Sequence, residues 1–172
     1  DHVTHALGFV DAAPSPPVRF LDLGSGAGIP GLALVLSWPA ARGVLLDGSA
    51  RRVAFLRRAV LQLGIEGRAE VLEARAEVAG HDARWRERFD LVVARGFGPP
   101  ATTAECGAPF LAPGGALLVS DPPDGVERWP ADGLALLGLA PGPPGAAVRR
   151  LDRVAACPPH LPRRRPGKPP LF

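Results

Sequence analysis

Glycines spaced two apart follow the first apolar run of the chain. The segment over residues 21–31 reads Leu-Asp-Leu-Gly-Ser-Gly-Ala-Gly-Ile-Pro-Gly, which places Gly24, Gly26 and Gly28 in alternation. Glycine lets the backbone turn sharply and approach a ligand closely. An acidic residue, Asp22, precedes the first glycine by two positions. This order predicts a loop that binds a nucleotide-like ligand where a strand ends.

Asp47 is a second candidate because it ends the next apolar run, about twenty residues after the glycines. A carboxylate at this spacing can accept hydrogen bonds from the ribose hydroxyls of a bound nucleoside. It could instead cap the helix expected to start near Ala50. The loop also satisfies Gly-x-Gly-x-x-Gly through Gly26, Gly28 and Gly31, so this pattern alone leaves an NAD-binding protein open.

Apolar runs separated by segments of helical length would position these residues. Strands are expected over residues 18–23, 43–47, 69–74, 89–94 and 115–120, with two weaker ones near 134–139 and 146–156. The alternation of strands and helices predicts an α/β protein with a doubly wound, mostly parallel, seven-stranded sheet. Ligands bind at the carboxyl ends of the strands in such a sheet.

The clearest helix is predicted from Ala50 to Gly64. Its apolar residues are spaced three or four apart and would share one face: Val53, Leu56, Val60 and Leu63. Ser49 is placed to cap this helix and Gly64 to end it.

The length of 172 residues fits a single domain over 1–172. No apolar run reaches the ~20 residues of a membrane helix and no signal peptide is recognisable, so we expect a cytoplasmic protein. Cys106 and Cys157 lack the paired spacing of a metal or redox motif, and the histidines are scattered. We therefore expect two free thiols and no metal.

Basic residues are concentrated in a proline-rich tail over residues 158–172. The cations expected to contact RNA are Arg163, Arg164, Arg165 and Lys168. A basic run of this kind can also be only a solubilising face.

Four segments, over residues 22–32, 46–56, 75–77 and 92–97, resemble in order the RsmG (GidB) family of ribosomal RNA methyltransferases. The residues that distinguish this family from other methyltransferases are Gly-Ile-Pro-Gly in the first segment, Arg-Ala-Glu in the third and Ala-Arg in the fourth. The tail is similar to that family's basic C-terminal signature. Residues 1–17 would be a remnant of the family's N-terminal helical segment and a linker. Because the chain begins at Asp1 and has no methionine, we expect it to be N-terminally truncated.

The resemblance implies a Rossmann-like class I methyltransferase fold with its last strand antiparallel. It also implies methyl transfer from S-adenosylmethionine to guanine N7 of 16S ribosomal RNA in the small ribosomal subunit. It places Gly24 and Ile29 against the donor, Ala76 and Glu77 near its adenine, and Arg95 at the edge facing donor and substrate. The expected cofactor-binding residues are therefore Gly24, Gly26, Gly28, Ile29, Asp47, Ala76, Glu77 and Arg95. Guanine N7 has no proton to lose, so we expect positioning and no catalytic residue.

The chain departs from the family pattern after the fifth strand, where Ser120-Asp121 replaces the usual lysine-glycine. A positively charged residue of the family is replaced here by a negatively charged one, so the contact that the lysine would make with the substrate is in question. The alternatives are a class I methyltransferase of another RNA or of a small molecule, and a non-catalytic RNA-binding domain that retains the fold. An NAD-dependent dehydrogenase is less favoured because of Asp22 and the downstream segments.

Overall fold

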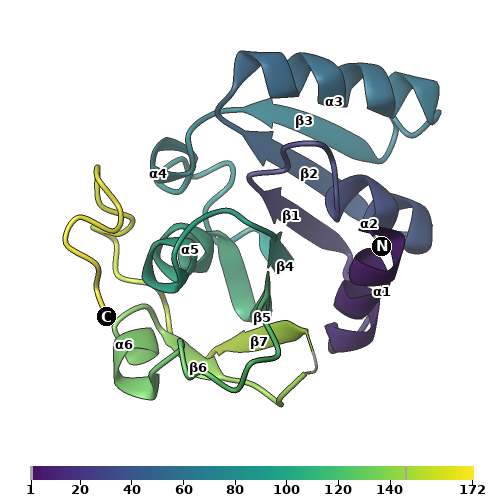
Figure 1. Cartoon of the computed structure of the whole chain (residues 1–172). Helices are drawn as coiled ribbons and strands as arrows, with labels where there is room; N and C mark the ends of the chain where they lie inside the picture. The colour runs from purple at the N-terminus through teal and green to yellow at the C-terminus, as the bar shows by residue number, and fades with distance from the viewer. Residues whose placement is uncertain (1, 146) are drawn as a thin grey trace.

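Seven strands form one mixed sheet in the computed structural model, which describes residues 2–145 and 147–172, with side chains from residue 6 onward. The sheet order is β3-β2-β1-β4-β5-β7-β6 (Figure 1). The strands are β1 Arg19–Leu23, β2 Arg42–Asp47, β3 Ala69–Glu73, β4 Phe89–Ala94, β5 Leu111–Ser120, β6 Leu139–Pro141 and β7 Val148–Arg153. Strands β1 to β5 are parallel, whereas β7 is antiparallel to both β5 and β6. The predicted fold class, including its antiparallel last strand, is confirmed.

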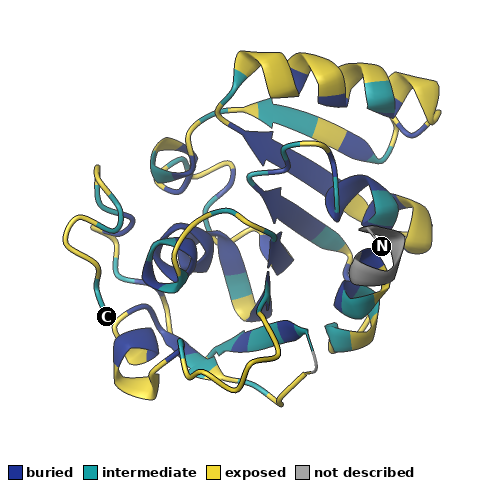
Figure 2. Cartoon of the chain, viewed as in Figure 1, coloured by how far each residue is buried: buried dark blue, intermediate teal, exposed yellow. Residues whose placement is uncertain are grey.

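Helices cover both faces of this sheet (Figure 1). They are α1 His2–Ala12, α2 Gly31–Ser37, α3 Ala50–Gln62, α4 Ala76–Ala79, α5 Pro100–Gly107 and α6 Ala131–Ala135, with a 3-10 turn, η1, at Ala108–Phe110. Residues of α1, α2 and α3 pack into one apolar core with Phe20 of β1. Residues of α4, α5 and α6 pack into a second core with Leu21 and Leu23. Successive β1 side chains therefore enter opposite cores, and the central strands are buried on both faces (Figure 2).

Helix α3 largely follows the predicted pattern. Val53, Leu56 and Val60 are buried, and Gly64 adopts a left-handed φ of 64° directly after the helix. Ser49 is the N-cap residue, but its side chain makes no capping hydrogen bond. The prediction that Leu63 shares the buried face is wrong, because its side chain is 45% exposed beyond the end of α3.

Two weaker strand predictions need correction. The strand expected at 134–139 is wrong, because α6 ends at Ala135 and β6 begins only at Leu139. Gly138 turns the chain between them with a φ of 73°. The strand expected at 146–156 appears as Val148–Arg153, and Ala146 lies outside the described residues.

The two ends of the chain lie over opposite faces of the sheet (Figure 1). Residues 2–12 form α1, in the region expected to hold a helical remnant, and Asp1 lies outside the described residues. The segment from Pro158 to Phe172 contains neither helix nor strand, yet Leu161, Leu171 and Phe172 pack against the α4–α6 core. This proline-rich tail is therefore docked on the body of the molecule. Across the described residues, no helix is long and apolar enough to cross a membrane.

Candidate functional site

The glycine loop leaves the carboxyl end of β1 beside β4, where the strand order reverses direction. Crevices that bind ligands form at such switch points. Gly24, Gly26 and Gly28 have φ angles of 70°, 54° and 86°, a backbone region that residues other than glycine rarely adopt. A Cβ atom on Gly24 would lie 2.6 Å from the ring of Phe97. The backbone path of this loop is thus compatible only with glycine.

Buried polar groups hold this loop in shape. The Asp22 carboxylate accepts a hydrogen bond from the Gly31 amide at 3.0 Å, and the Ser25 amide donates to the Leu46 carbonyl at 2.9 Å. Burial raises the pKa of Asp22 to about 7, and the negative charge of Asp47 adds to this rise, while hydrogen bonds from Ser25 and Gly31 oppose it. Asp22 therefore supports the glycine loop from the protein interior, a role that its position in the motif does not predict.

Asp47 connects the glycine loop to the start of α3. One carboxylate oxygen accepts the Gly26 amide at 2.9 Å, and the other accepts the Ser49 amide at 2.8 Å. The side chain is 5% exposed, and the Arg52 guanidinium lies 3.7 Å from it. The Ser49 contact links Asp47 to the residue that precedes α3. It does not exclude a ligand, because each carboxylate oxygen has a second lone pair.

The segment after β3 supplies the opposite wall. Ala76 is buried at the start of α4. The Glu77 carboxylate is 14% exposed and forms an ion pair of 2.5 Å with the exposed Arg75 guanidinium. The N–H groups at the start of a helix favour hydrogen-bond acceptors.

A cavity of about 390 Å³ joins these segments, which is within the roughly 300–1,000 Å³ of small-molecule sites. It is lined by Gly24, Asp47, Gly48, Ser49, Arg52, Arg75, Ala76, Glu77, Gly96 and Phe97. Three other hollows in the described residues are larger, so its lining rather than its volume marks the site. One of them, beside Arg42 and Arg68, lies at the opposite, amino edge of the strands.

Four of the eight predicted cofactor-binding residues line this cavity: Gly24, Asp47, Ala76 and Glu77. Gly26 lies against Asp47, whereas Gly28 packs over Leu32 in α2. Ile29 and Arg95 are partly buried and do not line the cavity. Phe97, which no spacing rule selected, forms its wall.

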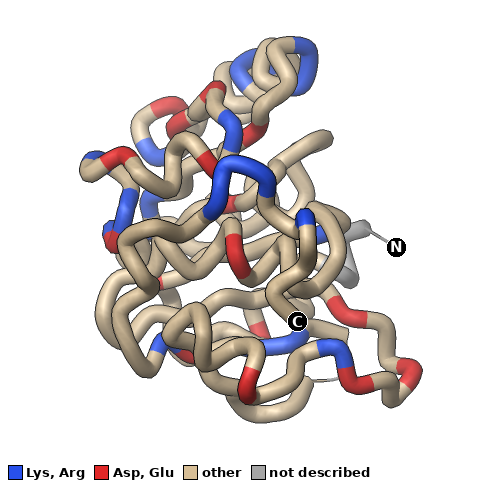
Figure 3. The backbone as a smooth tube through the Cα atoms, turned by 90° about the vertical axis from the view of Figure 1, so that its left-hand side faces the viewer, with Lys and Arg blue, Asp and Glu red and all other residues tan. Residues whose placement is uncertain are grey.

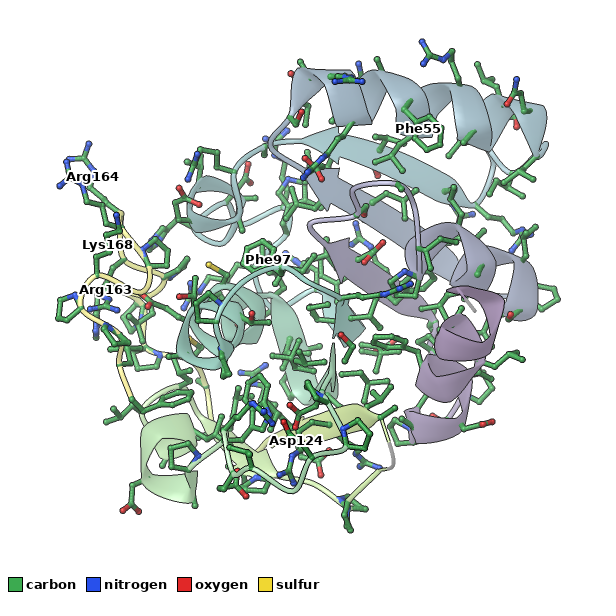
Figure 4. All side chains as sticks on the ribbon, viewed as in Figure 1. Phe55, Phe97, Asp124, Arg163, Arg164 and Lys168 are labelled. Carbon is green, nitrogen blue, oxygen red and sulfur yellow. The ribbon has the colours of Figure 1, made fainter. Side chains whose placement is uncertain are left out.

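A second hollow, of about 780 Å³, also borders the glycine loop. It is lined by Gly26, Ala27, Ser49, Arg51, Arg52, Phe55 and Arg58. Phe55 is 43% exposed and projects from α3 (Figure 4). No sequence pattern singles out this exposed aromatic ring among arginines.

Asp121 belongs to the Ser120-Asp121 pair that replaces the family's lysine-glycine, and its charge is neutralised within the chain. Its carboxylate accepts a hydrogen bond from the Trp129 indole at 3.1 Å. It also lies 3.6 Å from the Arg128 guanidinium and 3.9 Å from that of Arg149. The negative charge is thus compensated locally.

The predicted RNA-binding cations lie away from the cavity lining. Arg164, Arg165 and Lys168 are exposed, whereas the Arg163 guanidinium is bound to the buried Glu105 carboxylate. Within the described part of the chain, no cluster of His, Cys, Asp and Glu could hold a metal ion. Cys106 and Cys157 are buried free thiols.

Comparisons with known proteins identify the family of the chain. The family model described as GidB, rRNA small subunit methyltransferase G, matches residues 1–120. The Ribosomal RNA small subunit methyltransferase G of Moorella thermoacetica is 37% identical to the chain, over 98% of this chain and 75% of the relative. The protein of the same name from Prochlorococcus marinus strain MIT 9313 is 40% identical, over 60% of this chain and 42% of the relative. The chain thus spans only part of these relatives.

Solved structures support the fold. An O-methyltransferase family protein from Burkholderia thailandensis superposes with a TM-score of 0.62 at 15% sequence identity, covering 90% of this chain and 57% of that one. At this identity the likeness establishes the architecture and carries no information on the substrate.

Proposed function

Because the chain belongs to the rRNA small subunit methyltransferase G family, we propose that it transfers a methyl group from S-adenosylmethionine to guanine N7 of 16S ribosomal RNA. One observation carries the proposal: segments following β1, β2, β3 and β4 converge on a single cavity beside the glycine loop. The small ribosomal subunit would be the partner. A protein with this substrate acts in the cytoplasm.

The cavity fits the donor because its lining offers complementary groups. The backbone of Gly24 leaves open a space that a Cβ would fill, and Asp47 has carboxylate lone pairs for ribose hydroxyls. Ala76 and Glu77 would border the adenine. Gly26, Gly28 and Ile29 would shape the loop that receives the rest of the donor, with Arg95 at the substrate edge.

Bound S-adenosylmethionine supplies a methyl group on a positively charged sulfonium, ready for transfer to a nucleophile. Guanine N7 presents an in-plane lone pair and carries no proton, so the protein needs no general base. The chain must align the base with the methyl group and exclude water. Phe97, which follows β4 at the cavity wall, can contribute an apolar surface for this purpose.

Two features support RNA as the substrate over a small molecule. Arg51, Arg52 and Arg58 surround the exposed Phe55 ring beside the glycine loop, an arrangement suited to phosphates and a stacked base. Arg164, Arg165 and Lys168 add exposed positive charge in the C-terminal segment.

The test is transfer of radiolabelled methyl from S-adenosylmethionine to bacterial small subunits that lack the modification. Chemical cleavage selective for N7-methylguanine should then give one new cleavage site. Absence of transfer, on a sample that binds S-adenosylhomocysteine, would refute the proposed substrate. Absence of binding as well would favour a non-catalytic RNA-binding domain.

Asp47→Asn is expected to weaken S-adenosylhomocysteine binding about tenfold, since hydrogen bonds to a charged group contribute about 1.5–3 kcal/mol. The amide has one acceptor oxygen where the carboxylate has two, and both carboxylate oxygens already accept backbone N–H groups. Isothermal titration calorimetry measures the change. Glu73→Gln is the matched control, because Glu73 ends β3 at the same sheet edge and does not line the cavity. Equal losses in the two variants would contradict the role of Asp47.

A further inference from the structure

The C-terminal segment over residues 157–169 is fastened to the body of the molecule by Arg86. Its guanidinium donates hydrogen bonds to the carbonyls of Cys157 at 3.0 Å, Pro158 at 2.9 Å and Leu161 at 2.7 Å. It also donates to the Gly80 carbonyl, just after α4, at 2.8 Å. The path of the segment is thus fixed against α4 before it reaches its basic residues.

A buried carboxylate fixes the next stretch. Glu105 of α5 is 0% exposed and accepts two hydrogen bonds from the Arg163 guanidinium, at 2.8 and 2.7 Å. It also accepts the Arg163 amide at 2.9 Å and the Gly167 amide at 3.4 Å. One side chain therefore holds both ends of the turn over residues 163–167. Burial opposes the charge of Glu105, but its bonds to Arg163 outweigh burial and keep its pKa below the usual value.

This ion pair is better suited to fixing geometry than to adding stability. Removing two charges from water costs about as much as their attraction returns, so apolar replacements often stabilise a protein equally well. The planar guanidinium and carboxylate, however, hold each other in one orientation. The arrangement therefore points to a need for a defined loop.

The fixed turn packs against α5 and against the end of α4. Gly167 packs so closely on Thr102 that a Cβ would collide with its hydroxyl, and Thr102 lies near the start of α5, which follows Phe97. Pro162 contacts Gly80 at the other end of the turn. The segment thus contacts α4, which contains the cavity-lining Glu77, and α5, which follows the cavity-lining Phe97.

The turn directs its other cations outward. Arg164, Arg165 and Lys168 are exposed, and Arg164 projects away from the molecule (Figure 4). Figure 3 faces this side and shows the basic stretch on the outside of the fold. Cations held in place before binding lose less conformational entropy when they meet phosphates.

We infer that Glu105 is a positioning residue for RNA binding, which fixes the 163–168 turn so that Arg164, Arg165 and Lys168 meet the phosphates of the substrate RNA. Arg163 is the internal anchor of this turn and does not contact RNA. The inference rests on the proposed function and adds the residue that builds the RNA-binding surface.

The test measures the dissociation constants of the full chain for 16S RNA and for S-adenosylhomocysteine. Glu105→Gln should weaken RNA binding about tenfold, through loss of the preorganised turn, and change donor binding less than about twofold. Replacing Arg164, Arg165 and Lys168 together by alanine should weaken RNA binding and lower the slope of log affinity against log salt by about two. Adding Glu105→Gln to that triple variant should cause little further loss, because both changes remove the same contacts.

Arg163→Lys separates an anchor from an RNA contact. Lysine keeps the charge but cannot form the paired hydrogen bonds to Glu105. The variant should therefore bind RNA as weakly as Arg163→Ala. Wild-type affinity in Arg163→Lys would overturn the anchor role.

Gly167→Ala disturbs the turn without altering the buried carboxylate, which covers the case in which Glu105→Gln fails to fold. It should weaken RNA binding, whereas Gly114→Ala, with a similar φ of 78° and no atom within 4 Å of the added Cβ, should not. If wild-type and turn variants bind RNA equally well, this inference fails and the proposed function stands. If the wild type binds no RNA, both fail.

Discussion

Gly24→Val is expected to weaken binding of S-adenosylhomocysteine roughly a hundredfold or more, about 2.7 kcal/mol. The first atom of the new side chain would lie 2.6 Å from the Phe97 ring, and the branched remainder would enter the cavity wall. The backbone also holds a φ of 70°, which valine rarely adopts. Calorimetric titration with S-adenosylhomocysteine measures the loss.

Gly64→Val is the matched control for this substitution. Gly64 has a φ of 64° at the end of α3, and an added Cβ there would meet no atom within 4 Å. The control imposes a comparable backbone penalty away from the cavity, so it should lower the melting temperature and leave donor binding intact. Similar donor affinity in wild type and Gly24→Val would overturn the assignment of the site.

The stability of the fold should fall as the pH rises from about 4 to about 7, because of Asp22. Burial raises the pKa of this carboxyl to about 7 in the folded chain, whereas an unfolded chain ionises it near 4. Between these values the folded state binds the extra proton, so increasing pH favours the unfolded state. The contribution present below pH 4 is lost above pH 7 and amounts to about 4 kcal/mol.

Asp22→Asn isolates this contribution, because asparagine can accept the Gly31 amide without ionising. Urea unfolding of both proteins at steps from pH 4 to pH 8 gives the difference in unfolding free energy. That difference should shift in favour of the variant as the pH rises. Curves that stay parallel would show that Asp22 ionises in the folded state near its ordinary pKa.

Local sequence patterns were sufficient to predict the central strands and α3. Strand β4 has the predicted bounds because its residues are apolar apart from Asp90 and lie between polar segments. The apolar stretch after Trp129 was misassigned, since a short run of leucine and alanine fits a helix and a strand equally well. The left-handed Gly138 and the preceding Pro130 are the local signals that separate α6 from β6.

The candidate site was predicted where single residues follow strands, and missed where side chains meet across the fold. Asp47 is predicted from its position at the end of the second strand, and Ala76 from the resemblance of the segment after β3 to the family. The contact between Gly24 and Phe97 joins two strands that are neighbours only in space. Likewise, the partner of Arg163 is a glutamate 58 residues earlier, and no spacing rule connects them.

The separation of Glu105 from Arg163 has a consequence for synthesis on the ribosome. At roughly 5–20 residues per second, the glutamate emerges about 3–12 seconds before the arginine that neutralises it. During that interval α5 carries a carboxylate that favours water over the apolar core. The nascent chain can therefore assemble the strands around the glycine loop early, while the wall next to the C-terminal segment closes only when residues 163–167 arrive.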